Sequence, residues 1–518
     1  MAAKKGKQAR RAGLILLAMM MSLALLLSAC SSNNGNGTAS NGNQGSESEN
    51  SASPEPSTEP LKEVELSYYY LTFSEQTDVA AVQAEVNKIT KEKINATVKL
   101  YPLTWDNFAQ KVNVMSAAGD PFDLVFTAAW LPNSYYTSVA KNAFLPMDDL
   151  LDKYAPTVKS SFTDKLWDGT RVNGKIYGSI NKQIMAMPTG VAVRTDLAEK
   201  YKLDPNSVKR YNDMEPFYEQ VIKGEGGKVH PIYELNFSRD PGYSNMDAIG
   251  DTSLPGWVSS EATDELKVVN QYESQAFKDW MAMTNGWFKK GYLFFDDFLP
   301  NIDNTPKMKA GGFASMLGKP IKPGVASEEK NRFAQDFTYI PLTKATITST
   351  TATLTAISRT SKNPERAAML IELLNTDKEL YNLMCFGIEG KHYKLVDGQV
   401  AEAIADSGYG PNTDWIFGNQ FNAYYRSKGD VGNWEKTEEI NNSAEVSPLL
   451  GFNFNPEPIK TEAAQVAAVM KEFDHLELGV VDIDKQYPKF LDKLKKAGAD
   501  KIIAEKQKQL DEWLAAQK

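Results

Sequence analysis

The chain has 518 residues, of which 24% are charged and 42% are hydrophobic, and its formal net charge is −9. The first 29 residues hold five basic and no acidic side chains, so the remainder carries 52 Lys and Arg against 66 Asp and Glu. Because nucleic acids and anionic membrane surfaces are bound by clustered Lys and Arg, this acidic balance argues against both as direct partners.

The N-terminal region has the composition of a cleaved export signal. Basic residues precede an apolar run from Leu14 to Leu27, and this run is shorter than the roughly 20 residues that span a membrane. The sequence LSAC at 27–30 resembles the bacterial lipobox, in which the cysteine receives a diacylglycerol. The resemblance implies that residues 1–29 are a lipoprotein signal peptide and that Cys30 is lipidated at the extracellular face of the cell membrane. The alternative is an ordinary secretory signal with an unrelated cysteine.

A polar tether is expected to follow at residues 30–60, which are mostly Ser, Asn, Gly, Glu and Pro. A flexible coil of this length has a root-mean-square reach of roughly 30 Å, so it would keep a domain close to the membrane. The 458 residues that remain exceed the size of one hydrophobic core, and two lobes are therefore expected. Cys385, the second cysteine, is expected to be a buried thiol.

Alternating strand and helix patterns begin after the tether. A strand at 64–73, a helix at 78–93 and a strand at 94–103 predict a βαβ unit. The next helix is expected to end at Gly119 and to lead into a short buried strand at 123–126. The sequence thus predicts an α/β sheet in the first part of the chain.

Later segments continue the same pattern and then change. Amphipathic helices are predicted at 211–224 and 276–290, the second ending at Gly291, and another helix opens at Pro364. Residues 401–518 differ in texture, because aromatic and polar residues without a clear period are followed by helical patterns. They are interpreted as an appended helical region.

Several short motifs together resemble one known family, the extracellular solute-binding proteins of ABC transporters, in their family-one, maltose-binding-like group. The motifs are AAGDPFDLVF (117–126), NAFLPMDDLLDKYA (142–155), VNGKIYGSI (172–180), WFKKGYL (287–293) and SKNPERAAMLIELL (361–374). The C-terminal sequences GIEGKHYKL, GFNFNPEP and LKKAGADKIIAEKQKQLDEW resemble the uncharacterised C-terminal domain of the LipO/LplA-type lipoproteins in this family.

The resemblance implies an α/β fold of the type II periplasmic-binding-protein kind, with two α/β lobes, a hinge and a cleft between the lobes. Lobe 1 is expected at about 61–185 and 312–352, and lobe 2 at about 190–310 and 353–400. A helical C-terminal extension, 401–518, would pack on the lobes. The implied function is capture of a carbohydrate and its delivery to a membrane permease by a monomer without a cofactor, since a separate subunit consumes ATP.

Candidate ligand contacts are chosen by their place in loops after strands, because ligands of open α/β sheets lie beyond the carboxyl ends of strands. A sugar offers apolar C–H faces to aromatic rings and hydroxyls to planar polar groups. Trp130, Tyr135 and Tyr136 follow the strand at 123–126, and Trp257 lies in another loop. Trp280 and Trp287 lie on helix faces instead and are expected in the core.

Four further candidate ligand contacts lie later in the chain. Arg239 and Tyr243 lie in the loop NFSRDPGYSNM, where Arg239 would bind hydroxyls or a carboxylate, or would form a surface ion pair instead. Lys319, with its neighbour Lys322, raises the hypothesis of an acidic sugar, and two solvated lysines are the alternative. Trp415 would complete the site if the appended region covers it.

Other functional classes leave weaker signals. A secreted glycan-active hydrolase needs only two suitably spaced carboxylates, and a binding protein for a non-sugar solute such as a peptide also stays open. The histidines His230, His392 and His475 do not have the spacing of a zinc site, and no EF-hand loop is present, so no metal is expected. A scaffold protein would be expected to show repeats, which this sequence lacks.

Overall fold

The structure is a computed structural model that describes residues 61–244, 246–259, 266–299 and 302–517. The predicted signal peptide, Cys30 and the tether lie outside these residues. Among the helices in the described ranges, none combines the length and the apolar character needed to cross a bilayer.

The first sheet is built on the predicted βαβ unit. Its strands run in the order β2 (Ala96–Thr104), β1 (Val64–Thr72), β3 (Leu124–Thr127), β15 (Leu354–Ile357) and β6 (Ser179–Ile180). β1 pairs in parallel with both β2 and β3, whereas β15 is antiparallel to β3 and to β6. The βαβ prediction is confirmed, because α1 (Val79–Ile94) connects β1 to β2.

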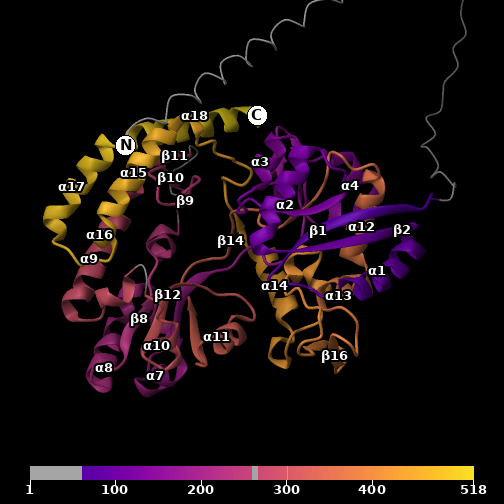
Figure 1. Cartoon of the computed structure of the whole chain (residues 1–518). Coiled ribbons are helices and arrows are strands. Elements are labelled where there is room, and N and C mark those ends of the chain that lie inside the picture. The colour runs from indigo at the N-terminus through magenta and orange to yellow at the C-terminus, as the bar shows by residue number, and fades with distance from the viewer. Residues whose placement is uncertain (1–60, 245, 260–265, 300–301, 518) are drawn as a thin grey trace, which may run out of the picture. The chain divides into compact units, whose positions relative to one another are not determined.

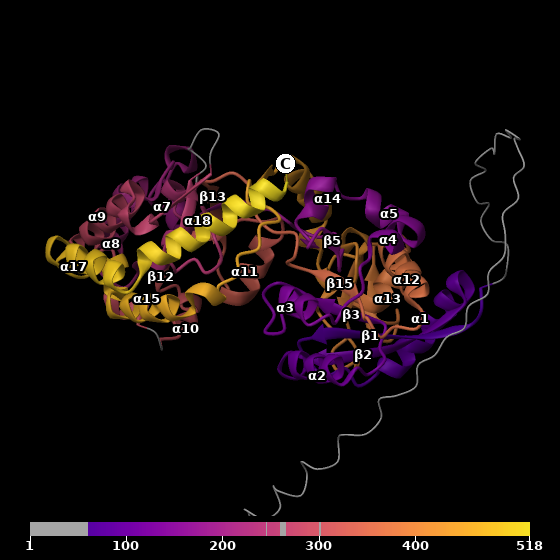
Figure 2. The ribbon, with the colours of Figure 1, turned by 90° about the horizontal axis from the view of Figure 1, so that it is seen from above.

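Helices from distant parts of the chain pack with this sheet around one hydrophobic core. Figure 1 shows the orange helices α12 and α13 beside the indigo α1, and Figure 2 shows α12 beside α4 and α5. Glu372 of α12 accepts hydrogen bonds from the backbone N–H groups of Thr157 and Val158 at the start of α5, at 3.1 and 3.2 Å. The helices are α2 (Trp105–Ala118), α3 (Tyr135–Ala140), α4 (Asp148–Tyr154), α5 (Pro156–Ser160), α6 (Asp164–Asp168), α12 (Pro364–Thr376) and α13 (Lys378–Phe386).

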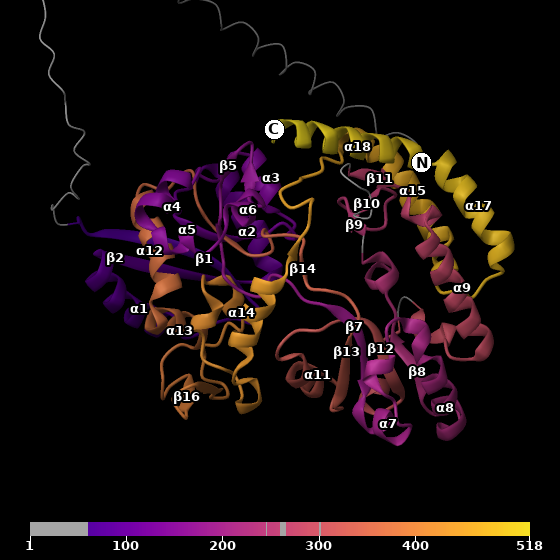
Figure 3. The ribbon, with the colours of Figure 1, turned by 180° about the vertical axis from the view of Figure 1, so that it is seen from behind.

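The second sheet corrects the predicted lobe boundaries. Its strands run in the order β13 (Phe337–Pro341), β7 (Thr189–Arg194), β12 (Phe313–Pro320) and β8 (His230–Glu234), and Figure 3 shows them together. The prediction that 312–352 belongs to lobe 1 and 353–400 to lobe 2 is wrong at these strands, since β12 and β13 lie here and β15 lies in the first sheet. Strand patterns show that a segment is extended but not which distant strand it pairs with. The helices of this lobe are α7 (Thr195–Lys200), α8 (Glu215–Glu225), α10 (Thr305–Lys309) and α11 (Val325–Phe333).

The region predicted as one appended domain divides in two. Its first part, up to α14 (Asn433–Ser443), continues from the hairpin of β16 (Tyr393–Val396) and β17 (Val400–Ala403), and it contributes Tyr409 and Phe417 to the core of the first lobe. The last segment forms another core with α9 (Gln275–Lys290) and an antiparallel sheet of β11 (Lys267–Val269), β10 (Trp257–Ser259) and β9 (Met246–Ala248). Its helices are α15 (Lys460–Glu472), α16 (Asp474–Glu477), α17 (Ile483–Lys496) and α18 (Ala499–Ala516).

Extended segments join the two lobes. Residues 181–188 lead from β6 to β7, and residues 342–353, here called the connector, lead from β13 back to β15. Within the connector, β14 (Thr346–Ile347) pairs in parallel with β18 (Glu445–Val446), which precedes the last segment. The chain therefore passes between the lobes at more than one place, as a hinged pair requires. A small hairpin of β4 (Arg171–Val172) and β5 (Lys175–Ile176) completes the first lobe.

Candidate functional site

Exposed aromatic side chains follow the parallel strands of the first sheet. Phe73 comes directly after β1, Trp105 directly after β2, and Trp130 follows β3; their exposed fractions are 57%, 48% and 45%. Because β1, β2 and β3 are parallel, their carboxyl ends lie at the same edge of the sheet. Large exposed aromatic groups gathered at such an edge are the pattern expected of a ligand site.

Three tryptophans form a group that we call the tryptophan platform: Trp105, Trp130 and Trp415. The rings of Trp105 and Trp130 are stacked, with centroids 5.6 Å apart and planes 7° from parallel. Trp130 also lies 6.1 Å from Trp415, and Trp415 meets Phe126 edge-on at 5.6 Å. Trp130 thus packs against other aromatic rings of the protein on more than one side. Trp105 lies at the outer end of the group, with about half of its surface open to solvent.

Hydrogen bonds fix the platform to the connector. The indole Nε1 of Trp130 donates to the carbonyl oxygen of Ala352 at 2.7 Å. The backbone N–H of Ala129 donates to the carbonyl of Thr351 at 2.9 Å. The loop that carries Trp130 is therefore held to the segment that leads to the second lobe.

The two tyrosines predicted beside Trp130 are less open. Tyr135 has no exposed surface; its hydroxyl donates to the Thr170 carbonyl at 2.6 Å and accepts from the Tyr177 N–H at 3.1 Å. Tyr136 is partly buried, and its hydroxyl lies 3.5 Å from Oγ1 of Thr351. Burial argues against ligand contact by Tyr135, because its ring and hydroxyl are already occupied by the protein.

Arg239 lies at the carboxyl edge of the second sheet. β8 and β12 are parallel, and Arg239 follows β8. Its guanidinium donates from Nη1 to the carbonyl of Gly318 at 3.2 Å, and its own carbonyl accepts from the Tyr211 hydroxyl at 3.0 Å. The guanidinium keeps further N–H groups beyond this bond, so it remains able to donate to sugar hydroxyls.

The lysines at the sheet edges are neutralised by carboxylates. Lys319 forms an ion pair with Glu329, and the two side chains are only 12% and 6% exposed. Lys322 pairs with Glu328 at 2.6 Å. Lys182, just beyond β6 of the first sheet, pairs with Glu438 at 2.8 Å. These pairings remove the observation that had favoured an acidic sugar.

Tyr243 and Trp257, also predicted as contacts, lie in the interior. They are 3% and 2% exposed and pack with each other at 5.5 Å between ring centroids. The Trp257 indole N–H donates to the Thr252 carbonyl at 3.2 Å. Both rings stabilise the core that includes the C-terminal helices, so their burial argues against a role in ligand binding.

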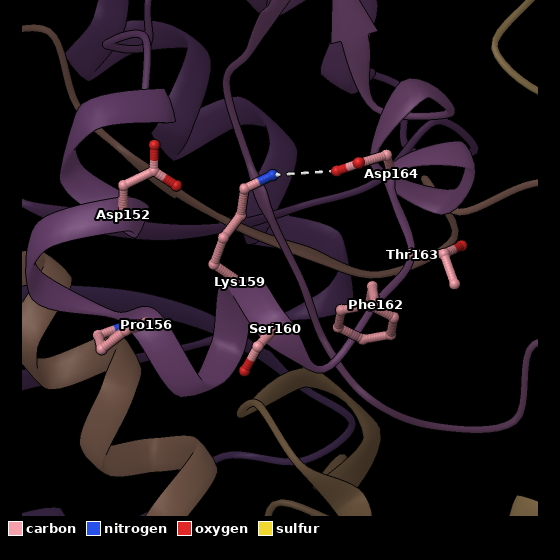
Figure 4. A pocket seen from close by; sticks show the side chains of 7 residues that line it. All are labelled: Asp152, Pro156, Lys159, Ser160, Phe162, Thr163 and Asp164. Atoms are coloured by element: carbon pink, nitrogen blue, oxygen red, sulfur yellow. Dashed lines mark ion pairs between the residues drawn. The ribbon is translucent and has the colours of Figure 1, made fainter.

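Two hollows occur among the described residues away from the platform. One of about 380 Å³ lies at α5 and α6, where Lys159 reaches toward Asp164 with 3.9 Å between charged atoms (Figure 4). The other, of about 260 Å³, lies in the second lobe between Asp240 and Trp280. The platform residues Trp105 and Trp130 line neither hollow.

The two sheets, their crossing segments and the aromatic edge define a type II solute-binding fold. The model of the family "Bacterial extracellular solute-binding protein" matches residues 74–380, and a domain of unknown function, DUF3502, matches 448–515. The chain belongs to the bacterial extracellular solute-binding protein family.

Several proteins similar to this chain are named after carbohydrates. A protein of Streptococcus pneumoniae called "Carbohydrate ABC transporter substrate-binding protein" is 29% identical over 444 residues, which are 84% of this chain and 88% of that protein. The crystal structure of the N-glycan transport solute-binding protein NgtS of the same species is 26% identical, with a TM-score of 0.74 over 88% of this chain and 100% of that one. The alginate-binding protein AlgQ2, at 16% identity and a TM-score of 0.54, shares the fold over 87% of this chain and 98% of its own.

Sequence reasoning missed Trp105 and Phe73. The criterion that selected Trp130, a position just beyond a strand, applies equally to Trp105 after β2. Phe73 was counted within the strand expected at 64–73, whereas β1 ends at Thr72. Trp105 also opens α2, so it was interpreted as part of a helix. The signal in the sequence that identifies Trp105 as a candidate is its position directly after a strand, at the first residue of the following helix.

Proposed function

We propose that this protein is the extracellular receptor of an ABC importer and that it captures a neutral oligosaccharide. The observation that carries the proposal is the stacked pair Trp105 and Trp130 at the carboxyl edge of the first sheet. The names of the similar proteins from Streptococcus pneumoniae support a glycan as the solute and a membrane permease as the recipient.

The chemistry of the edges favours a neutral sugar. An aromatic face packs well against the apolar C–H face of a pyranose, and such contacts contribute through buried area. The amines of Lys182, Lys319 and Lys322 are each paired with a carboxylate and offer little charge to a uronate. Arg239 supplies N–H donors for hydroxyl groups from the second lobe.

Closure of the lobes is the proposed response to binding. Three structures of NgtS share the same 26% identity and coverage with this chain, yet the TM-scores differ. The score is 0.74 for the structure described without a bound glycan, 0.62 for the Man1GlcNAc complex and 0.58 for the Man5GlcNAc complex. With sequence and coverage equal, the difference is one of conformation, which supports a hinge motion from the arrangement described here.

Lipidation of Cys30 would keep the receptor beside its permease, and we include it in the proposal. A diacylglycerol supplies two chains, and stable anchoring requires more than one. The wild-type protein is expected to enter the detergent phase after detergent partitioning of cells, whereas Cys30→Ala is expected in the aqueous phase. Equal partitioning of both proteins would contradict the anchor without touching the binding function.

Isothermal titration calorimetry with Man1GlcNAc, Man5GlcNAc and an alginate trisaccharide tests the ligand class. We expect saturable binding of a neutral glycan and weaker binding of the uronate. Trp105→Ala should lose affinity, while Phe288→Ala, which removes a 40% exposed ring on α9, should not. Release of smaller sugars during incubation would support a hydrolase, and failure to bind any neutral glycan would refute the proposal.

A further inference from the structure

The connector, residues 342–353, is bonded to both lobes. At its first end, the N–H groups of Leu342 and Thr343 donate to the carbonyl of Thr189 in β7, at 2.9 and 3.1 Å. The Thr189 N–H donates in return to Oγ1 of Thr343 at 2.8 Å. This end therefore moves with the second sheet.

At its other end the connector is bonded to the loop of the platform. Consecutive carbonyls, those of Thr351 and Ala352, accept hydrogen bonds from the Ala129 backbone and from the Trp130 indole. The hydroxyls of Tyr136 and Thr351 also lie 3.5 Å apart. The Trp130 bond differs from the Ala129 bond, because its donor belongs to a side chain that is 45% exposed and stacked on Trp105.

We propose that Trp130 is a positioning residue that couples occupation of the platform to closure of the lobes. Its ring supports Trp105, against which the sugar packs, and its indole N–H holds the connector at Ala352. The inference rests on the proposed function, because it assigns a role within the same site.

The coupling has a physical source in the solvation of this hydrogen bond. A ligand shifts a conformational equilibrium only if it interacts differently with the two states. In the present arrangement water competes for the half-exposed Trp130. A glycan packed on Trp105 excludes that water, and a hydrogen bond is stronger in a less polar environment. Binding thus strengthens the bond that fixes the connector to the first lobe, and coupling to closure requires this bond to be stronger in the closed arrangement than in the present one.

The comparison of Trp130→Phe with Trp105→Phe separates this role from stacking. Both changes keep an aromatic ring in the stack and remove an indole N–H. Among the described residues, the indole N–H of Trp130 donates a hydrogen bond, whereas none is found for the indole N–H of Trp105. Trp105→Phe is therefore the matched control for the loss of indole area.

The first measurement is amide hydrogen exchange of peptides that cover 345–354 in the ligand-free proteins. We expect Trp130→Phe to accelerate exchange there by about two- to tenfold, the change that corresponds to one net hydrogen bond. Trp105→Phe should exchange like the wild type. Equal exchange in all three proteins would overturn the inference.

The second measurement is small-angle scattering with saturating Man5GlcNAc, with affinities taken from calorimetry. Trp105→Phe should bind more weakly yet reach the full decrease in radius of gyration when saturated. Trp130→Phe should show a smaller decrease at saturation, and a full decrease would overturn the coupling. If the wild-type protein binds no glycan, the proposed function fails and the coupling fails with it, whereas the exchange experiment still decides whether Trp130 holds the connector.

Discussion

Lys506 of α18 is a buried amine whose replacement by Met should stabilise the protein. The side chain has no exposed surface, and its Nζ donates to the carbonyl of Gly256 at 3.2 Å. No ion pair of Lys506 with a carboxylate is found in the described part of the chain. Burial lowers the pKa of Lys506 from 10.5 to about 8, partly opposed by the charge of Asp251. A depression of this size corresponds to about 3 kcal/mol of lost stability below pH 8.

The sign of the pH dependence follows from proton linkage. Between pH 8 and 10.5 the unfolded state binds the proton of this lysine and the folded state releases it, so the free energy of unfolding rises with pH across this window. Met retains the unbranched stem that packs against Gly256 and removes the charge. We expect Lys506→Met to add about 2 kcal/mol at pH 7, less than the full amount because the surroundings relax, and to lose most of this advantage by pH 10.

Urea unfolding of the wild type, Lys506→Met and Lys508→Met at pH 7 and pH 10 measures this effect. Lys508 lies on the same helix with a 63% exposed side chain, so its replacement should change stability little at either pH. The comparison with the control removes contributions from tyrosines that titrate in the same range. A Lys506→Met protein that is no more stable than the wild type at pH 7, or equally favoured at both pH values, would refute the reasoning.

Three further predictions concern the site and its surroundings. Trp105→Ala should weaken neutral glycan binding by about ten- to thirtyfold in calorimetry with an unchanged circular dichroism spectrum, and unchanged affinity would remove Trp105 from the site. Burial, assisted by the charge of Asp474, raises the pKa of Glu477 to about 7, so stability is lost as pH rises from 4.5 to 7. Glu477→Gln should therefore raise the melting temperature at pH 8 but not at pH 4.5, and an equal effect at both would contradict this cause. Lys319→Met leaves Glu329 buried without its partner and should destabilise the protein by about 3 kcal/mol in urea unfolding. The double variant Lys319→Met with Glu329→Leu should recover most of this loss. A loss of Man5GlcNAc affinity in the Lys319→Met protein would instead place this amine in the site.

Local patterns predicted the ends of two helices. The helix expected to end at Gly119 does end there, since α2 stops at Ala118 and Gly119 adopts a left-handed conformation with φ of 71°. The helix expected to end at Gly291 is α9, which ends at Lys290. These boundaries were predictable because a helix end depends on residues close to it in the sequence.

Strand pairing was less accessible, because it depends on residues far apart. β12 reads as a strand in the sequence, but its neighbours β7 and β8 are supplied by residues about 80 to 130 positions earlier in the chain. The division of the C-terminal region into two parts was missed for the same reason. Tyr409 joins a core begun at Leu66, whereas Ile502 joins one begun at Tyr243.

The exposure of side chains in the candidate site was also difficult to predict from the sequence. Loop position selected Trp130, and Trp415 was added on the condition that the appended region covers the site; in the structure the two rings lie 6.1 Å apart, and Arg239 follows a strand. Loop position could not distinguish an exposed aromatic residue from a buried one, so Tyr135 and Trp257 were chosen for the same reason as Trp130. Exposure depends on what packs above a loop, and for Trp257 that cover includes residues more than 200 positions later.

The core around Tyr272 has a consequence for biosynthesis. It contains Ile459, Phe490 and Ile502 together with residues from Tyr243 to Met281. A chain that emerges N-terminus first cannot complete this core until residues 459–502 have been delivered. Release of a truncated product would leave the apolar faces of β10 and α9 uncovered, where they would promote aggregation or proteolysis. Stable packing of β10 and α9 thus depends on residues that are synthesised about 200 positions later.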